Sequence, residues 1–403
     1  SNPAGLGVYR RSEASLSPTL SFSNSEAVYF NQTTTNSNVN FSIPNLGVVL
    51  HSESSREGPF KGGAFGISLT KINDFNSRFS YAGENFDNSI IDFFLEDASG
   101  LTPGQLGGLT GIAFDHYLIN PDNPEQTEYF SDVAGFPIQE ETVETSGAQY
   151  QWSFGYGANF NDRFYIGANV GISTINYSEV KTFREYDFFD PANPNDISIL
   201  NEIDLRETLN ITGTGFNASI GMIYRPVDFI RIGANISSPT YYRLDEESFF
   251  DFTTDYNNYL FVPDDTLLNR ITTNGDFVLS RYDINTPMRI STGVAFFLGK
   301  SGFITLDADF LDYSSISLQS NDFSTVADNQ TIENLYKDVV NLRAGAEFRA
   351  KNLRFRVGYA RQGDALNIDD DFDRSINIYS AGMGLRYKSY FVDLAVQHTR
   401  QDR

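Results

Sequence analysis

The sequence predicts an all-β protein, namely a transmembrane antiparallel β-barrel of about fourteen strands with long extracellular loops. Three observations lead to this fold class. The 403-residue chain contains 35 Phe, 22 Tyr and 32 Gly but only one Trp and three Met, and such a composition favours strands over helices. Apolar and polar residues alternate along many segments, and tight turns alternate with long connections.

Alternation of apolar and polar residues is the pattern of a strand whose two faces meet different surroundings. In one example, the apolar residues Phe164, Ile166, Ala168, Val170 and Ile172 are separated by Tyr165, Gly167, Asn169 and Gly171. The same pattern recurs in 216–225, 230–236, 341–349, 353–359, 379–387 and 390–397. These segments are therefore expected to be strands with one apolar and one polar face.

The lengths of the connections favour a barrel over a two-sheet sandwich. Tight turns are expected at 161–163, 226–228, 299–302, 350–352 and 388–389, and long acidic connections at about 86–147, 184–201, 242–274, 320–337 and 363–374. Short turns at one rim and long loops at the other are typical of outer-membrane barrels. We count about thirteen strands, and because such barrels have even strand numbers we expect fourteen. Either a final strand lies outside the given sequence or one strand is miscounted.

Composition argues against several classes of function. No run of 18 or more apolar residues occurs, so no transmembrane helix is expected. Cys is absent, which excludes disulfides and thiolate metal sites. A net charge of −23 argues against nucleic-acid binding. His51, His116 and His398 lie far apart, without a metal-type spacing or a nucleophile. We therefore expect no enzyme, no cofactor and no metal.

One acidic loop was weighed separately as a cation site. It contains Asp369, Asp370, Asp371 and Asp373, and carboxylate oxygens are the ligands that Ca²⁺ prefers. The spacing does not match an EF-hand, and acidic loops are more often simply solvated. Solvation is the interpretation we favour.

Short segments at the start and in the C-terminal third share a further pattern. The chain opens Ser1-Asn2-Pro3-Ala4-Gly5-Leu6-Gly7. The pair Thr286-Pro287 follows, and short motifs that contain Gly, aromatic or charged residues lie at 293–295, 306–310, 341–348, 353–359 and 391–395. In order and spacing they resemble the FadL/TodX family of hydrophobic-compound transporters, in its Bacteroidota branch. The resemblance implies that residues 1–14 are the end of an N-terminal hatch, including Asn2, Pro3 and Ala4, and that 15–403 form the barrel.

The connection at about 86–147 is the candidate ligand-binding region. It holds two apolar segments, one after a helix cap expected at Asn88 and Ser89 and one after Thr102-Pro103. The resemblance implies that this loop captures a lipophilic ligand, which would explain exposed apolar helices. The candidate residues are Phe86, Ile90, Phe93, Phe94, Leu95, Leu106, Leu109, Ile112 and Phe114. The structural alternative is that they pack together as a lid or against a partner protein.

Charged residues at polar positions of the expected strands form a second candidate site, a lumen charge network. It consists of Asp307, Asp309, Arg343, Glu347, Arg354, Arg356, Arg386 and Asp393. Such a network can act as a selectivity or gating surface. The structural alternative, which we favour, is that opposite charges on neighbouring strands neutralise one another inside a wide lumen.

These features together predict a protein of the Gram-negative outer membrane that passes hydrophobic compounds, such as long-chain fatty acids, passively through a plugged barrel. Its expected partners are membrane lipid and a lipophilic small molecule. Gly62, Gly63, Gly66 and Gly83 make the third strand the expected site of a wall defect through which the ligand leaves. One alternative is a non-transporting, PorV-like scaffold within a larger outer-membrane secretion or assembly complex. A weaker alternative is a diffusion porin with an open lumen.

Overall fold

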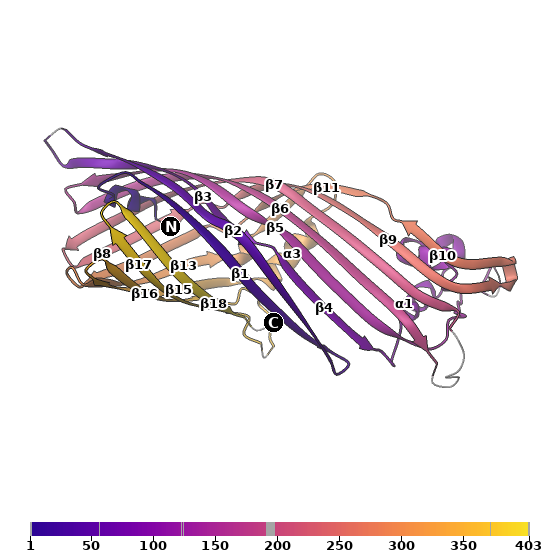
Figure 1. Cartoon of the computed structure of the whole chain (residues 1–403). Helices are drawn as coiled ribbons and strands as arrows, with labels where there is room; N and C mark the ends of the chain where they lie inside the picture. Colours follow the sequence, from indigo (N-terminus) through magenta and orange to yellow (C-terminus); the bar gives the residue numbers. More distant parts are fainter. Residues whose placement is uncertain are drawn as a thin grey trace.

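The computed structural model describes residues 2–55, 57–121, 123, 125–190, 198–370 and 372–401. They form one antiparallel sheet of eighteen strands with a few short helices (Figure 1). The strands are β1 (Glu13–Tyr29), β2 (Gln32–Glu53), β3 (Phe60–Asp74), β4 (Ser77–Glu84), β5 (Phe136–Phe160), β6 (Phe164–Phe189), β7 (Leu200–Val227), β8 (Ile230–Ser237), β9 (Tyr241–Phe261), β10 (Thr266–Asn274), β11 (Val278–Asn285), β12 (Arg289–Phe297), β13 (Gly302–Asp312), β14 (Ser317–Ser320), β15 (Asp338–Ala350), β16 (Leu353–Gln362), β17 (Ile376–Tyr387) and β18 (Tyr390–Arg400). The helices are η1 (Pro3–Val8), α1 (Ile90–Ala98), η2 (Pro103–Gln105), α2 (Gly108–Asp115), η3 (Val262–Asp264), η4 (Tyr313–Ser315) and α3 (Val326–Leu335).

Several wall strands are divided by short breaks. Both β3 and β4 pair with β5, and both β8 and β9 pair with β7. The segments β10 and β11 both pair with β9, while β12 continues the same crossing beside β8, and β13 and β14 form the next one. Five breaks thus turn eighteen segments into thirteen crossings of the wall. The all-β antiparallel class is confirmed, but the described residues supply one crossing fewer than the fourteen predicted.

The first and last crossings form the two edges of the sheet. Within the described residues, β1 pairs only with β2, and β18 pairs only with β17. An even number of chain reversals separates β1 from β18, so the two strands run in the same direction. They therefore cannot form an antiparallel ladder with one another, and no parallel ladder joins them among the described residues.

An apolar belt runs around the outer face beside the rim where the tight turns lie, which we call the short-turn rim. On β6 the belt comprises Phe164, Ile166, Ala168, Val170 and Ile172, and the paired residues of β7 continue it. The belt continues on the strands of the C-terminal third, where Val357 on β16 is 63% exposed and Leu394 on β18 is 70% exposed. The belt is roughly nine or ten residues tall on each strand, which is the length that a tilted strand needs to cross the hydrocarbon of a bilayer.

The wall is much taller on one side than on the other. Strands β5, β6 and β7 contain 25, 26 and 28 residues, whereas β15, β16, β17 and β18 contain 13, 10, 12 and 11. We call β5, β6, β7 and β9 the tall wall and β15 to β18 the short wall (Figure 1). Above the belt, exposed residues of β6 become polar, beginning with Thr174 and Asn176.

The tall wall corrects the predicted connections. Residues expected in loops at 242–274 form β9 and β10, and most of 184–201 that the structure describes belongs to β6 and β7. Strand β5 begins at Phe136, so the connection after the third crossing is shorter than the expected 86–147. Above the belt the outer face of a strand is polar, and apolar residues gather only where the strand meets the core under α1 and α2, so the regular alternation that identifies a strand in the sequence is lost.

Helices α1 and α2 cover the upper end of the tall wall. Phe94 on α1 packs with Leu200, Ile203 and Phe252 of β7 and β9, and the buried cluster also includes Leu118. Among the described residues no helix is both long and apolar enough to cross a bilayer. The core of the upper end is therefore built by two short helices lying against extended strands.

Candidate functional site

The helix η1 lies inside the barrel and holds the predicted hatch residues Asn2, Pro3 and Ala4. The Asn2 amide nitrogen donates to the carbonyl oxygens of Met222 on β7 and Ala234 on β8, both at 2.9 Å. Its side-chain oxygen accepts from the Ala4 backbone nitrogen at 2.9 Å and caps the helix. One side chain thus joins the plug to two neighbouring wall strands, satisfying carbonyl groups on both.

A row of glycines on successive strands makes room for η1, and we call it the glycine cradle. Its members are Gly66 on β3, Gly155 and Gly157 on β5, Gly167 on β6, and Gly221 and Gly233 on β7 and β8. A Cβ added at Gly167 would lie 2.5 Å from the carbonyl carbon of Pro3, closer than real Cβ atoms approach. Only glycine allows the plug backbone to come this close to the wall.

The cradle glycines are functional candidates that the sequence analysis missed. Gly167 lies at a polar, inward position of the alternating pattern, and so do Gly221 and Gly233. Glycine repeated at inward positions of neighbouring strands was the available signal. The signal was not recognised because register between strands is needed to place these glycines at one height.

An ion pair at the short-turn rim fastens the end of the plug segment. The Arg10 guanidinium donates to the Asp162 carboxylate at 2.5 Å, in the turn between β5 and β6. The Asn159 side chain also donates to Asp162, at 2.7 Å. This hydrogen bond and the nearby Arg10 charge hold the pKa of Asp162, which lies outside the apolar belt, below its usual value. Asp162 therefore remains ionised and available to Arg10 at neutral pH.

The wall has a break in its backbone ladder between β2 and the third crossing. The β2–β3 ladder ends at the pair Asn45–Thr70, and among the described residues β4 pairs with β5 alone. Side chains bridge the interval: Asn36 donates to Ser80 at 2.9 Å, Asn40 to Asp74 at 3.1 Å and Lys71 to Ser42 at 2.7 Å. Contacts between side chains separate more readily than a continuous backbone ladder.

This break lies in the third crossing, as predicted, but away from the glycines that predicted it. Gly63 and Gly66 pair regularly with both neighbours of β3, Gly62 pairs with both beside a register shift at Phe60, and Gly83 pairs with Gln139 on β5. The strand is interrupted instead at Phe75 and Asn76, between β3 and β4. The prediction therefore identified the right crossing from residues that do not themselves interrupt it.

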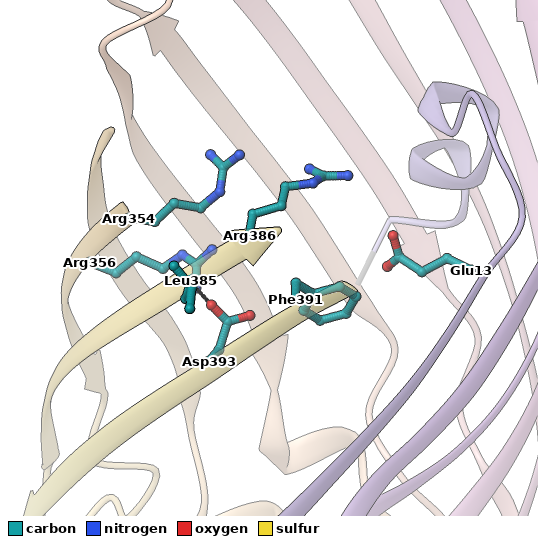
Figure 2. A pocket seen from close by; sticks show the side chains of 7 residues that line it. All are labelled: Glu13, Arg354, Arg356, Leu385, Arg386, Phe391 and Asp393. Carbon is teal, nitrogen blue, oxygen red and sulfur yellow. Dashed lines mark hydrogen bonds and ion pairs between the residues drawn. The ribbon is translucent and has the colours of Figure 1, made fainter. Parts of the chain in front are cut away.

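The lumen charges form cross-strand ion pairs. Glu347, which is 8% exposed, accepts from Arg349 at 2.6 Å, Arg354 at 3.3 Å and Arg356 at 2.7 Å. Arg356 also donates to Asp393 at 2.6 Å, as Figure 2 shows. On neighbouring strands Arg343 pairs with Asp309 at 2.7 Å. Six of the eight residues of the predicted network thus form ion pairs. This arrangement corresponds to the structural alternative, in which opposite charges inside the lumen neutralise one another.

A cavity of about 180 Å³ lies beside this network near the short-turn rim. Figure 2 shows the Arg354 and Arg386 side chains on one side of it and Glu13 of β1 on the other. Arg386 and Asp307 have no ion-pair partner in the part of the chain that the structure describes. The cavity therefore lies between β1 and β18 and carries more positive than negative groups.

The predicted ligand-binding residues are placed mostly within the upper-end core. Phe94 is fully buried, whereas Phe86 and Phe93 are 51% and 57% exposed. The others, partly buried against the same cluster, are Ile90, Leu95, Leu106, Leu109, Ile112 and Phe114. The arrangement is closest to the lid described as the structural alternative, with Phe86 and Phe93 left on its outer surface.

Two buried polar residues support this lid. The Glu185 carboxylate on β6 accepts from the Ile90 backbone nitrogen at 2.7 Å and from Gln139 at 2.7 Å, so it caps α1. Burial raises the pKa of Glu185. The two ring nitrogens of His116 lie 3.1 and 2.8 Å from the hydroxyls of Thr254 and Thr273. Burial lowers the pKa of His116 to about 4.

Two aspartates of the acidic loop at 369–373 form ion pairs with nearby arginines. Asp370 accepts from Arg374, and Asp373 accepts from Arg361 at 3.0 Å. Asp371 lies outside the described residues. Over the described ranges no group of three His, Cys, Asp or Glu side chains is arranged to hold a metal ion. These ion pairs agree with a loop that is neutralised by the protein itself.

Comparison with known proteins rests on structure. No family profile and no curated protein matches the sequence. The CymD monoaromatic hydrocarbon channel matches with a TM-score of 0.52 at 11% identity, over 100% of this chain and 87% of that one. The toluene transporter TodX of Pseudomonas putida matches at 0.50 and 12% identity, over 98% and 86% of the two chains.

A FadL homologue of Pseudomonas aeruginosa gives a similar result. It matches with a TM-score of 0.52 at 13% identity, over 100% of this chain and 84% of that one. Identities this low establish the shared architecture and leave ligand and mechanism to other arguments. The likeness extends over nearly the whole chain. The chain therefore has the FadL/TodX barrel fold, as its sequence segments predicted.

Proposed function

We propose that this protein is an outer-membrane channel of a Gram-negative bacterium that passes hydrophobic small molecules by passive diffusion. The observation that carries the proposal is the ladder break between β2 and β4 beside a lumen occupied by η1. A compound that cannot continue along a plugged lumen has a lateral way out only where the wall can separate. The apolar belt supports placement in a bilayer, and the fold shared with TodX and CymD supports the class of cargo.

The path begins at the tall end and leaves through the side. A lipophilic molecule would first contact exposed rings on the lid, of which Phe86 and Phe93 are the largest. It would then descend to η1 and leave between Asn40 on β2 and Asp74 on β3, where side chains alone close the wall. Because the break begins at the upper edge of the apolar belt, a molecule that leaves there enters the lipid directly.

A reversible cross-link across the break tests this path. The chain has no cysteine, so the pair Asn40→Cys and Asp74→Cys introduces the only two thiols. Uptake of radiolabelled toluene and oleate is measured in a deletion strain that expresses this variant. Oxidation is expected to abolish uptake, and a reductant is expected to restore it. The matched control is Phe310→Cys with Val340→Cys, a register pair in the regular β13–β15 ladder.

Two results would overturn the proposal. The first is uptake that is unchanged when the gene is deleted, which would remove the transport function altogether. The second is uptake that persists in the oxidised Asn40–Asp74 variant after the cross-link has been verified, which would remove the lateral exit. In the first case the PorV-like scaffold becomes the better hypothesis, whereas in the second the protein still transports and the compound must leave by another route. Affinity purification in mild detergent would in the first case be expected to yield a large partner in stoichiometric amount.

A further inference from the structure

A second cavity, of about 320 Å³, lies in the lumen along the inner faces of β8, β12 and β13 and beside Asn2 of η1. Three guanidinium groups line it, from Arg231, Arg289 and Arg343, together with the carboxylates of Asp307 and Asp309. Its apolar lining includes Phe297 and Phe303. The lumen therefore contains a polar, cationic site that a path for neutral hydrocarbons does not require.

Two of the three guanidiniums lack a counter-charge. Arg343 pairs with Asp309 at 2.7 Å, but no carboxylate of the described residues forms an ion pair with Arg231 or Arg289. The Nε atom of Arg231 is buried without a hydrogen-bond partner. A buried charge is unfavourable unless an opposite charge or a full set of hydrogen bonds compensates it. The site thus has an unfilled capacity for an anion.

Unpartnered oxygen atoms in the same cavity call for hydrogen-bond donors rather than for an anion. Asn235 and Asp309 are 4% and 2% exposed, and each has one buried side-chain oxygen without a hydrogen-bond partner. Nearly all buried polar atoms of folded proteins find a partner, in the protein, in water or in a ligand. The unpaired Nε–H of Arg231 is thus the group of this cavity that an anion would satisfy, while the oxygens of Asn235 and Asp309 can accept from water or from a donor group of a ligand.

The surroundings of Arg231 indicate which kind of anion fits. Its guanidinium lies 4.4 Å from the centre of the Phe297 ring. The Phe297 and Phe303 rings are paired across β12 and β13 with centres 5.6 Å apart. A guanidinium held against a ring keeps its N–H edge free for a carboxylate. Two adjacent rings beside that edge offer a flat apolar surface to an aromatic body.

We propose that this cavity binds an aromatic monocarboxylate, with the carboxylate on Arg231 and the ring against Phe297 and Phe303. The volume accommodates a molecule with a single ring, and a neutral hydrocarbon of the same shape would leave Arg231 unpaired. The inference rests on the proposed function only in that the compound reaches the cavity through the lumen. It deepens that function by adding a charged class of cargo to the neutral one.

The test measures benzoate binding to the full-length protein in detergent by isothermal titration calorimetry at low ionic strength. Wild type is expected to bind benzoate, and to bind the neutral isostere benzamide at least tenfold more weakly. Arg231→Gln is expected to lower benzoate affinity at least tenfold, and Arg231→Lys by less, because lysine keeps the charge but loses the bidentate geometry. The matched control, Arg243→Gln, removes an exposed arginine of β9 that pairs with Asp283 and is expected to change nothing.

Phe303→Leu keeps every charge and provides a second variant should Arg231→Gln fail to fold. It is expected to weaken benzoate binding while leaving acetate binding unchanged. The inference is overturned if benzoate and benzamide bind equally, if folded Arg231→Gln binds benzoate as wild type does, or if Phe303→Leu has no effect. Benzoate binding together with toluene uptake that is insensitive to gene deletion would refute the proposed function and leave this site standing. The reverse result would refute the site alone.

Discussion

The tall wall and the short wall belong to one sheet and follow the same antiparallel ladder, yet they meet different surroundings. Strands of the short wall are barely longer than the apolar belt, so their side chains face either the apolar outer surface or the lumen. Strands of the tall wall continue well above the belt and bury an apolar core under α1 and α2. The short wall pairs most of its charges inside the lumen, with Arg386 as an exception, whereas the tall wall has a buried carboxylate, Glu185, that caps α1. The two walls thus share the same strand geometry, and their surroundings decide where apolar and charged side chains are placed.

The largest expected effect is on the short wall. Glu347→Gln would leave Arg349, Arg354 and Arg356 without their shared carboxylate, and removing one partner of a buried ion pair costs about 3–5 kcal/mol. The control on the tall wall is Glu207→Gln, whose pair with Lys181 at 3.4 Å is exposed and contributes below about 1 kcal/mol. Urea unfolding followed by the fluorescence of Trp152, the single tryptophan, measures both. Equal losses would contradict the contrast between the walls.

The next effect separates the plug from the rest of the lumen. Gly167→Ala on the tall wall would push a Cβ into the Pro3 backbone, and overpacking of this kind costs about 1–3 kcal/mol. Gly345→Ala on the short wall is the control, because its nearest contact is the Thr305 hydroxyl at 3.2 Å. Single-channel recordings in planar bilayers are expected to show more frequent open events for Gly167→Ala only. Closed channels in both variants would argue against η1 as the plug.

Acidification is expected to change the stability of the lid, formed by α1 and α2, at the upper end of the tall wall. Because burial lowers the pKa of His116 to about 4, an opened lid takes up a proton more readily than the closed lid as the pH falls below about 6.5. The lid should lose up to about 1.4 kcal/mol per pH unit between pH 6.5 and 4. The raised pKa of Glu185 acts in the opposite sense, adding stability as the pH falls. Hydrogen exchange of α1 and α2 at pH 7 and pH 5 measures the net effect.

His116→Gln provides the control for this experiment. The glutamine cannot titrate, so the protection factors of amides in α1 and α2, which correct for the intrinsic exchange rate at each pH, should no longer fall between pH 7 and pH 5. Amides of β15 to β18 should respond equally in both proteins, because His116 lies far above the short wall. A wild-type lid that is equally protected at both pH values would show that His116 does not limit its stability.

The smallest effect concerns the rim. Asp162→Asn removes the pair with Arg10, whose partners are about half exposed, so the plug should lose less than about 1 kcal/mol. Because the folded pKa of Asp162 is lowered, wild type should lose the same contribution as the pH falls through that value. Proteolysis of the N-terminal segment measures it, with Asp228→Asn as the control, since Asp228 pairs with Arg225 away from η1. Equal cleavage of wild type and Asp162→Asn would contradict the role of this pair.

How far the sequence predicted the structure differs between the two walls. Within the belt, the strand containing Phe164 to Ile172 and the tight turn at 161–163 were predicted, because lipid on one face imposes strict alternation. Above the belt, β9 and β10 were predicted as loops, because the outer face is polar there and the residues that they bury, such as Phe252 and Leu268, do not alternate regularly along the chain. At the lid, the sequence identified Phe94 and its apolar neighbours but did not decide whether they line a groove or form a core.

By itself the sequence determined the fold class, the short-turn rim and the inward position of the lumen charges. Each of these depends on local period and turn chemistry, which neighbouring residues along the chain express directly. Only the tertiary structure decided that Gly167, Gly221 and Gly233 form one cradle, that Glu347 collects three arginines and that Arg231 is left unpaired. These features depend on register between strands distant in sequence, because register alone decides which inward side chains share a height in the lumen.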